Sequence, residues 1–304
     1  MRKAAHVTLI FFAFASCDLT ASTTFERLKQ CVEQKDRACI LACLKDAPAA
    51  RSANDFALLA SAHMLVGQNQ EAVDSIRRAN ERAPGNFGYL MDQGWIFQRS
   101  GDQIDAIRSF LLAAKIEPHS PQVFYELGMS FFLSQEWERA TRHFAESLRL
   151  DPKQDKAEFM LGVVAIWSSD LQQAKVHFVN ALKLKPNNAH YLLHYGVLLA
   201  ALNEMDLAMA NLQEAERLDP SNPLTRYQLG KRYRQMKKYP QARGELEAAV
   251  RLRPTLAPAF YQLGQVYKQL GEDAKAQQAL RQFALLTQRE KTEKEDPVDE
   301  NLEN

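Results

Sequence analysis

The feature that most constrains this chain is a 34-residue period that covers most of its length. Prolines, alanines and glycines each recur at this interval. The positions are Pro84, Pro118, Pro152, Pro186, Pro220 and Pro254; Ala72, Ala106, Ala140, Ala174, Ala208, Ala242 and Ala276; and Gly94, Gly128, Gly162, Gly196, Gly230 and Gly264, with Ala60 at the first place of the glycine series. A fixed period of this length indicates a repeat architecture, in which each repeat packs against its neighbours.

Each periodic residue has a physical reason to recur. We number the places of a repeat from 1, with repeats starting at Ala53, Phe87, Pro121, Asp155, Ala189, Pro223 and Ala257. Places 4, 7, 8 and 11 share one side of a first helix, because successive residues turn by about 100°. We expect this stripe to pack on a second helix, with small residues at places 8 and 20 letting the two helices approach closely. Proline at place 32 ends the second helix, and Gly67, Gly101 and Gly271 mark the turn between helices.

Composition agrees with a helical, non-nucleic-acid-binding protein. Gly and Pro number only 12 each in 304 residues, which disfavours a turn-rich β fold or a disordered chain. The 38 basic and 37 acidic side chains leave a formal net charge of +1. A nucleic-acid binder needs a basic face that displaces counterions, so this balance argues against one.

The repeats resemble those of the tetratricopeptide-repeat family, whose pattern is W-x2-L-G-x2-Y…A-x3-F…P over 34 residues. The third repeat carries the pattern most fully, and the fourth departs from it most, with Glu158 and Ala165 where aromatics are usual. The matching residues of the third repeat are Phe124, Leu127, Gly128, Phe131, Ala140, Phe144 and Pro152. The resemblance implies an all-α fold, a right-handed superhelical α-solenoid of stacked helix pairs.

The domain organisation follows from the same period. Residues 53–290 hold seven repeats, and residues 18–52 fit one degenerate helix pair that caps the N-terminal end. Residues 291–304 are strongly charged and have no apolar stripe, so we expect a disordered tail.

Residues 1–17 have the composition of a secretory signal peptide. Arg2 and Lys3 precede the apolar run VTLIFFAFA, and the small residue Ser16 follows. The segment around Cys17 resembles a bacterial lipobox, which would make Cys17 a lipidation site; the alternative is cleavage before Ser16, after an Ala-x-Ala motif. Either way we expect an exported protein, periplasmic or anchored on the extracytoplasmic side of a membrane, with a lipid anchor as its sole membrane attachment.

Three further cysteines, Cys31, Cys39 and Cys43, lie close together in the sequence. A helical hairpin that turns near Lys35 and Asp36 would place Cys31 and Cys39 opposite each other, as a candidate disulfide outside the cytoplasm. The alternative is three small buried thiols. No metal site is expected, because a zinc site needs four ligands at other spacings.

Candidate functional residues lie on the first helices, opposite the packing stripe. The resemblance implies that places 2, 6, 9 and 13, with 5 and 12 beside them, line a groove for a partner segment. They are mostly apolar in repeats two to five and polar or basic beyond. The candidates are Trp95, Tyr125, Met129, Phe132, Phe159, Met160, Val163, Ile166, Trp167, His194 and Val197, followed by Lys231 and Arg234. Large apolar patches usually mark interaction sites; the alternative is that these residues pack between neighbouring first helices.

We therefore predict a non-catalytic scaffold or chaperone-like adaptor that acts outside the cytoplasm and binds a protein or peptide with an apolar segment. The alternative is a structural protein that assembles with further copies of itself. No cofactor is expected, and no phosphate-binding loop, nucleophile elbow or HExxH motif occurs in the sequence.

Overall fold

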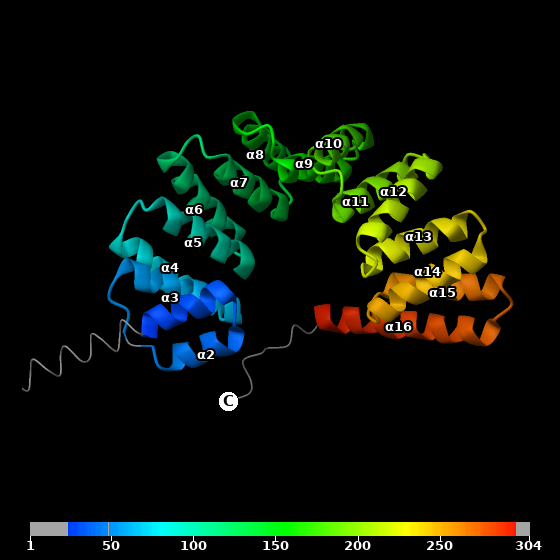
Figure 1. Ribbon diagram of the computed structural model, residues 1–304, viewed down its shortest axis with the longest axis horizontal. Coiled ribbons are helices and arrows are strands. Elements are labelled where there is room, and N and C mark those ends of the chain that lie inside the picture. Colours follow the sequence, from blue (N-terminus) through cyan, green and yellow to red (C-terminus); the bar gives the residue numbers. More distant parts are fainter. Residues whose placement is uncertain (1–23, 48, 296–304) are drawn as a thin grey trace, which may run out of the picture. The chain divides into compact units, whose positions relative to one another are not determined.

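The computed structural model describes residues 24–47 and 49–295 of the chain. The expected signal peptide, residues 1–17 with Cys17, lies outside the described residues, as do residues 296–304 of the expected tail. All regular structure in the described residues is helical. The chain divides into an N-terminal unit, residues 1–152, and a C-terminal unit, residues 153–304, each a stack of helix pairs (Figure 1).

The described part of the N-terminal unit holds eight helices, and that of the C-terminal unit also holds eight. The N-terminal unit begins with a helix over residues 24–34, followed by α2 (Arg37–Lys45), α3 (Ala53–Val66), α4 (Asn69–Arg82), α5 (Phe87–Ser100), α6 (Gln103–Ile116), α7 (Pro121–Leu133) and α8 (Trp137–Leu150). The C-terminal unit contains α9 (Asp155–Trp167), α10 (Leu171–Leu184), α11 (Ala189–Ala201), α12 (Met205–Leu218), α13 (Pro223–Gln235), α14 (Tyr239–Leu252), α15 (Ala257–Gln269) and α16 (Asp273–Glu295).

The helix bounds follow the repeat. The first helices α3, α5, α7, α9, α11, α13 and α15 each begin at place 1. The periodic proline stands two residues after the last residue of the second helix in the first six repeats. Proline lacks an N–H and disfavours helical backbone before it, so the helix stops there.

The two helices of a repeat approach each other closely where the residue at place 8 of the first helix contacts the residue at place 24 of the second helix. A Cβ added at Gly94 would lie 2.3 Å from Cε1 of Phe110, and one at Gly162 would lie 2.5 Å from the ring of Phe178. Both rings are fully buried. In the last three repeats a leucine takes place 24 and meets the glycine in the same way. The glycine is therefore required because the partner side chain fills the volume of a Cβ.

The turn within a pair uses left-handed backbone in every repeat. Gly67, Gly101 and Gly271 supply it with φ between 74° and 84°. The other four repeats place non-glycine residues there, with φ near 60°: Gln135 (60°), Ser169 (62°), Asn203 (63°) and Lys237 (58°). Glycine is thus sufficient but not necessary, because the packed helices hold the turn at a small local cost.

The N-terminal helix pair packs on α3 and carries the cysteine cluster. Its buried residues Leu28 and Ile40 join Ala62 and Val66 in one apolar core. The structure joins Cys31 and Cys39 by a disulfide, with Cα atoms 5.7 Å apart. Cys43 is a free, buried thiol, and its Sγ lies 3.8 Å from that of Cys31.

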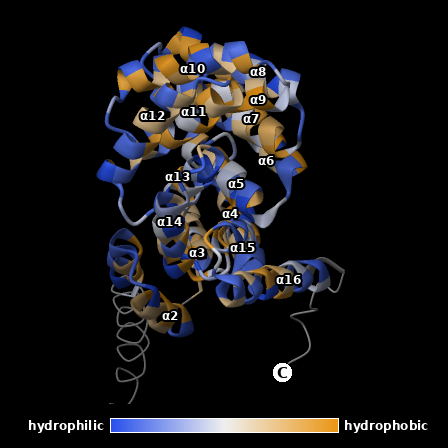
Figure 2. Cartoon of the chain, turned by 90° about the vertical axis from the view of Figure 1, so that its right-hand side faces the viewer, coloured by the Kyte–Doolittle hydropathy of each residue, from blue (hydrophilic) through white to orange (hydrophobic). Residues whose placement is uncertain are grey.

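The last helix is longer than the period predicts. α16 continues to Glu295, past residue 290 where the seventh repeat was expected to end. No Gly or Pro occurs between Gly271 and Pro297, and the intervening Gln, Arg, Lys and Glu are good helix formers. Figure 2 shows the contrast between hydrophobic α9 and hydrophilic α16. None of the helices in the described residues is both long and apolar enough to cross a membrane.

Candidate partner-binding surface

We call the first-helix residues at places 2, 5, 6, 9, 12 and 13 the inner face, because they lie opposite the stripe that packs on the second helix. The inner face of the N-terminal unit comes from α3, α5 and α7, and that of the C-terminal unit comes from α9, α11, α13 and α15.

In the N-terminal unit, Trp95 is the candidate with an exposed side chain, at 38%. Tyr125, Met129 and Phe132 are half-buried. The ring of Tyr125 lies 5.6 Å from that of Phe144, and the ring of Phe132 lies against Trp137. Part of the surface of Tyr125 and of Phe132 is therefore already covered by contacts within their own repeat.

Polar bonds also cross the inner face of this unit. The Gln98 side-chain amide donates to Oγ of Ser130 at 2.7 Å and to the carbonyl oxygen of Glu126 at 3.2 Å, which ties α5 to α7. Asp92 is half-buried on α5, and loss of hydration raises the pKa of its carboxyl. The inner face of the N-terminal unit therefore exposes less apolar surface to a partner than the sequence suggested.

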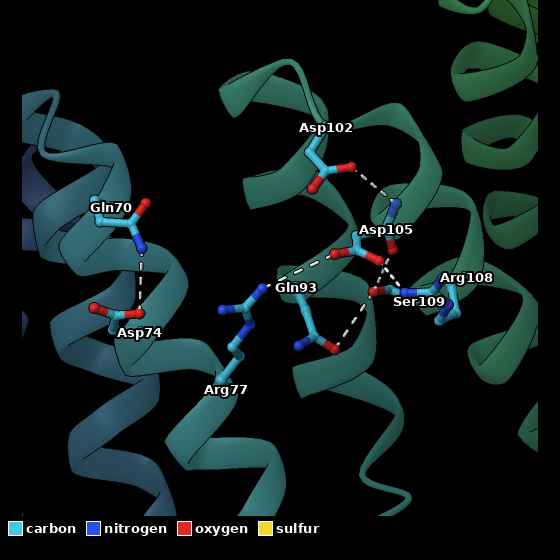
Figure 3. Close-up of polar contacts among 8 residues, drawn as sticks. All are labelled: Gln70, Asp74, Arg77, Gln93, Asp102, Asp105, Arg108 and Ser109. Atoms are coloured by element: carbon cyan, nitrogen blue, oxygen red, sulfur yellow. Dashed lines mark hydrogen bonds and ion pairs between the residues drawn. The ribbon is translucent and has the colours of Figure 1, made fainter.

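A second polar cluster in the N-terminal unit lies away from the inner face, among α4, α5 and α6 (Figure 3). Asp105 pairs with Arg77 of α4 at 3.9 Å and with Arg108, and its backbone N–H donates to Asp102. Arg77, Asp105 and Arg108 border a cavity of 210 Å³. The carboxylate of Asp105 is balanced by both arginines, so we assign the cluster a structural role in joining α4 to α6.

In the C-terminal unit, α9 supplies both buried and exposed candidates. Phe159 and Met160 are buried, with 7% and 9% of their surface exposed. Val163 and Ile166 are half-buried, whereas Trp167 at the end of the helix is 62% exposed. Trp167 is therefore the apolar side chain that α9 presents most fully.

Phe159 is covered because α11 packs aromatic rings against it. Its ring centroid lies 4.6 Å from that of Tyr191, 5.0 Å from His190 and 5.2 Å from His194. The hydroxyl of Tyr191 also donates to the carboxylate of Asp155 at 2.6 Å, which fixes α11 against the start of α9. This cluster explains why a helix with apolar residues on all sides is stable here.

The imidazoles of His190 and His194 lie 4.5 Å apart, centroid to centroid, on the inner face of α11. Burial lowers the pKa of His194 to about 4, and the neighbouring His190 contributes to the shift. Burial also lowers the pKa of His190. His194 is therefore neutral at pH 7 and adds an aromatic face to the surface. Val197 is half-buried one turn further along α11.

We expect acid to destabilise the C-terminal unit through His194. An unfolded histidine has a pKa of about 6.5, so the unfolded chain binds a proton between pH 6.5 and 4 that the folded chain does not, and stability falls as pH drops through this window. His194→Phe should flatten the pH dependence of the free energy of unfolding, measured by chemical denaturation at pH 7 and 4.5. The same pH dependence of the free energy of unfolding in His194→Phe and in wild type would contradict this role. So would a flattening of equal size in His119→Gln, the control at an exposed residue.

The cationic end of the inner face lies on α13. Nε of Arg234 donates to Oε1 of Gln262 on α15 at 2.6 Å, and Lys231 is half-buried beside it. Burial lowers the pKa of Lys231, as do the positive charges of Arg232 and Arg234. The inner face thus changes from aromatic on α9 and α11 to basic and amide-rich on α13 and α15.

Sequence reasoning missed Arg232, which is 93% buried (7% exposed) on α13. It stands at place 10, where the other repeats carry small or apolar buried residues: Ala62, Ile96, Ser130, Val164, Leu198 and Val266. An arginine at a place that is otherwise apolar or small was the signal that could have found it.

Family models match three segments of the C-terminal unit. Residues 159–223 and 257–288 match models described as tetratricopeptide repeat, and residues 230–271 match one described as TPR repeat. In a comparison with curated proteins, none matched the sequence.

Several solved structures share the fold. One is a chain of the APC/C hetero-tetramer Cut9-Hcn1, with a TM-score of 0.63 and 20% identity over 79% of this chain; the match spans 48% of that chain, about half its length. A tetratricopeptide repeat protein from Parabacteroides merdae matches with a TM-score of 0.62 and 16% identity, over 78% of this chain and 94% of that one. PilF of Pseudomonas aeruginosa matches with a TM-score of 0.59 and 18% identity, over 68% and 94%. At these identities the likeness concerns the fold alone.

Proposed function

We propose that this chain, which belongs to the tetratricopeptide-repeat family, is a non-catalytic scaffold or chaperone-like adaptor that binds a segment of a partner protein on the inner face of its C-terminal unit. Proteins of this family generally act through protein–protein contacts. The observation that carries the proposal is the 62% exposure of Trp167 at the end of a helix whose other apolar side chains are buried or half-buried. Tryptophan is among the side chains most enriched at binding hot spots.

Neighbouring residues support an apolar contact at this place. Val163 and Ile166 are half-buried on the same helix, and the neutral imidazoles of α11 continue the surface. A partner segment with an aromatic or aliphatic side chain would cover Trp167 and remove its apolar area from water, which favours binding.

We also propose that the protein acts outside the cytoplasm. Two independent features support this: the signal-like composition of residues 1–17 and the disulfide between Cys31 and Cys39. Disulfides persist in oxidising compartments and are rare in the cytosol. Whether Cys17 is acylated decides between a membrane-anchored and a free form, and intact-mass measurement of the mature protein distinguishes the two.

Site-specific photocrosslinking in the native host tests the binding surface. A photoreactive phenylalanine derivative replaces Trp167 in one variant and Val176 in a matched control, since Val176 is 53% exposed on the second helix α10 of the same repeat. We expect a discrete product at Trp167 that is absent at Val176 and that mass spectrometry assigns to another protein. A product at twice the mass of the chain would instead favour self-assembly, and equal labelling at both sites would refute the surface.

A further inference from the structure

The cysteine cluster of the N-terminal helix pair holds a free thiol against a disulfide. Cys31 lies on the helix over residues 24–34, and Cys39 and Cys43 lie one turn apart on α2. Cys31 and Cys39 are joined, and Sγ of the free Cys43 lies 3.8 Å from Sγ of Cys31. All three Sγ atoms lie within 4.8 Å of one another. The cluster therefore brings a nucleophile to a bond that it can attack, because a thiolate cleaves a disulfide by bonding to one of its sulfur atoms.

Cys31 is the sulfur to which Cys43 can bond. The Cβ atoms of residues four apart on a helix are about 5–6 Å apart, whereas a disulfide needs about 3.8 Å between them. A bond between Cys39 and Cys43 would therefore distort α2. A bond from either residue to Cys31 joins two helices whose sulfur atoms already face each other. A cavity of 280 Å³ that borders Cys43 gives its side chain room to turn onto Cys31.

The two possible disulfides restrain the chain to a similar degree. Cys31 is separated from Cys39 by 8 positions in the sequence and from Cys43 by 12. The entropy of loop closure changes little between loops of such similar length. Each bond also links the same two helices, whose buried residues Leu28 and Ile40 share one core. We therefore expect the two pairings to be close in free energy.

The accessibility of the remaining thiol distinguishes the two pairings. Cys43 is only 4% exposed, whereas Cys39 is half-buried and follows the exposed residues Arg37 and Ala38. When Cys31 is bonded to Cys39, the free thiol is enclosed in the apolar core. When Cys31 is bonded to Cys43, the free thiol is that of Cys39, at the surface. The position of the bond thus decides whether a molecule in solution can reach the thiol.

We propose that Cys43 exchanges with the disulfide and makes Cys39 a reactive thiol that forms mixed disulfides with other molecules. In the first step the Cys43 thiolate attacks Sγ of Cys31. The Cys31–Cys43 bond forms, the Cys31–Cys39 bond breaks, and its electron pair leaves with Cys39, which takes up the proton that Cys43 released. In the second step the Cys39 thiolate attacks the disulfide of another molecule, one sulfur of which bonds to Cys39 while the other leaves as a thiolate. Neither step requires an external oxidant or reductant.

Reaction of the folded full chain with dithiobis-nitrobenzoate, an aromatic disulfide that releases a coloured thiolate, tests both steps. The chain carries Cys17→Ser, so that the cluster supplies the cysteines that are counted. We expect about one equivalent of coloured thiolate per chain. Digestion at acid pH, which stops further exchange, should place the adduct on Cys39 and show Cys31 joined to Cys43. An adduct on Cys43 or Cys31, or no reaction of the folded chain, would overturn the proposal.

Cys43→Ser and Cys39→Ser are the matched variants. Cys43→Ser removes the nucleophile and keeps the bond between Cys31 and Cys39, so the reaction with the probe should be lost. Cys39→Ser should also release no coloured thiolate, because Cys31 then bonds to Cys43. Undiminished reaction at Cys39 in Cys43→Ser, or two reactive thiols in Cys39→Ser, would contradict the exchange. Circular dichroism should show wild-type helicity in both variants, and the mapping in the chain that retains the three cysteines of the cluster does not depend on either.

Mass spectrometry of the native chain, alkylated in its host before extraction, identifies what Cys39 bonds to. A small thiol on Cys39 would raise the mass of the chain slightly, whereas a protein would give a larger product that a reductant separates. Finding neither adduct on Cys39 would overturn the second step. The cluster lies in the N-terminal unit, whereas Trp167 lies in the C-terminal unit. Loss of the Trp167 crosslink with Cys39 chemistry intact would therefore refute the proposed function alone, and the converse result would refute the exchange alone.

Discussion

Replacing Gly94 with alanine is expected to lower the free energy of unfolding by about 2 kcal/mol, although alanine favours helices more than glycine does. The added Cβ would lie 2.3 Å from Cε1 and 2.5 Å from Cζ of Phe110, whose ring is fully buried and cannot move without displacing its neighbours. The cost of this overlap exceeds the helix-propensity gain of about 1 kcal/mol. Chemical denaturation followed by circular dichroism measures the change.

Gly244→Ala is the matched control, because Gly244 lies in the middle of α14 and a Cβ there meets no atom within 4 Å. This variant should be more stable than wild type by about 1 kcal/mol. Opposite signs for the two glycine replacements would assign the effect to close packing, whereas equal signs would contradict it.

The first repeat suggests how to rescue Gly94→Ala. It carries Ala60 and Ile76 at places 8 and 24, where the second repeat carries Gly94 and Phe110. The double variant with Phe110→Ile recreates this pair, so we expect its loss of stability to be smaller than the sum of the two single losses by about 1 kcal/mol or more. Additive losses would show that the two places do not interact as the structure indicates.

The fold could be predicted almost completely because the 34-residue period is marked by two kinds of residue: small residues where helices pack closely, and prolines where helices end. Each first helix begins at the place that the period assigns, and the prolines end the second helices. The period could not show that Gln135 and Ser169 take left-handed backbone, because that conformation is imposed by packing between the helices rather than by local preference. Nor could it show that α16 runs on to Glu295, since the seventh repeat has no proline at place 32 to end the helix.

The exposed residues of the inner face were harder to predict. The position of a residue in a helix determines the side of the helix on which it lies, but it does not show which neighbouring helices cover that side. Phe159 and Trp167 are both apolar inner-face candidates on α9, yet their exposed fractions are 7% and 62%. Phe159 is covered because the rings of Tyr191, His190 and His194 on α11 lie against it. Arg232 was missed for the converse reason, because its backbone lies at a packing place while its guanidinium reaches the inner face.

Trp167→Ala is expected to weaken capture of the crosslinked partner at least about 30-fold, because a tryptophan that is buried at an interface contributes strongly to affinity. Trp167→Glu is expected to abolish capture, because binding would remove the new carboxylate from water. Since Trp167 is mostly exposed in the unbound chain, either change should alter the free energy of unfolding by less than about 1 kcal/mol. Val176→Glu, on α10 of the same repeat, controls for added charge and should leave capture unchanged. Pull-down from the native host with each variant, followed by quantitative mass spectrometry, measures the effect. Capture by Trp167→Glu at the level of Val176→Glu would show that the partner does not contact this side chain, and the search would then move to the basic residues of α13.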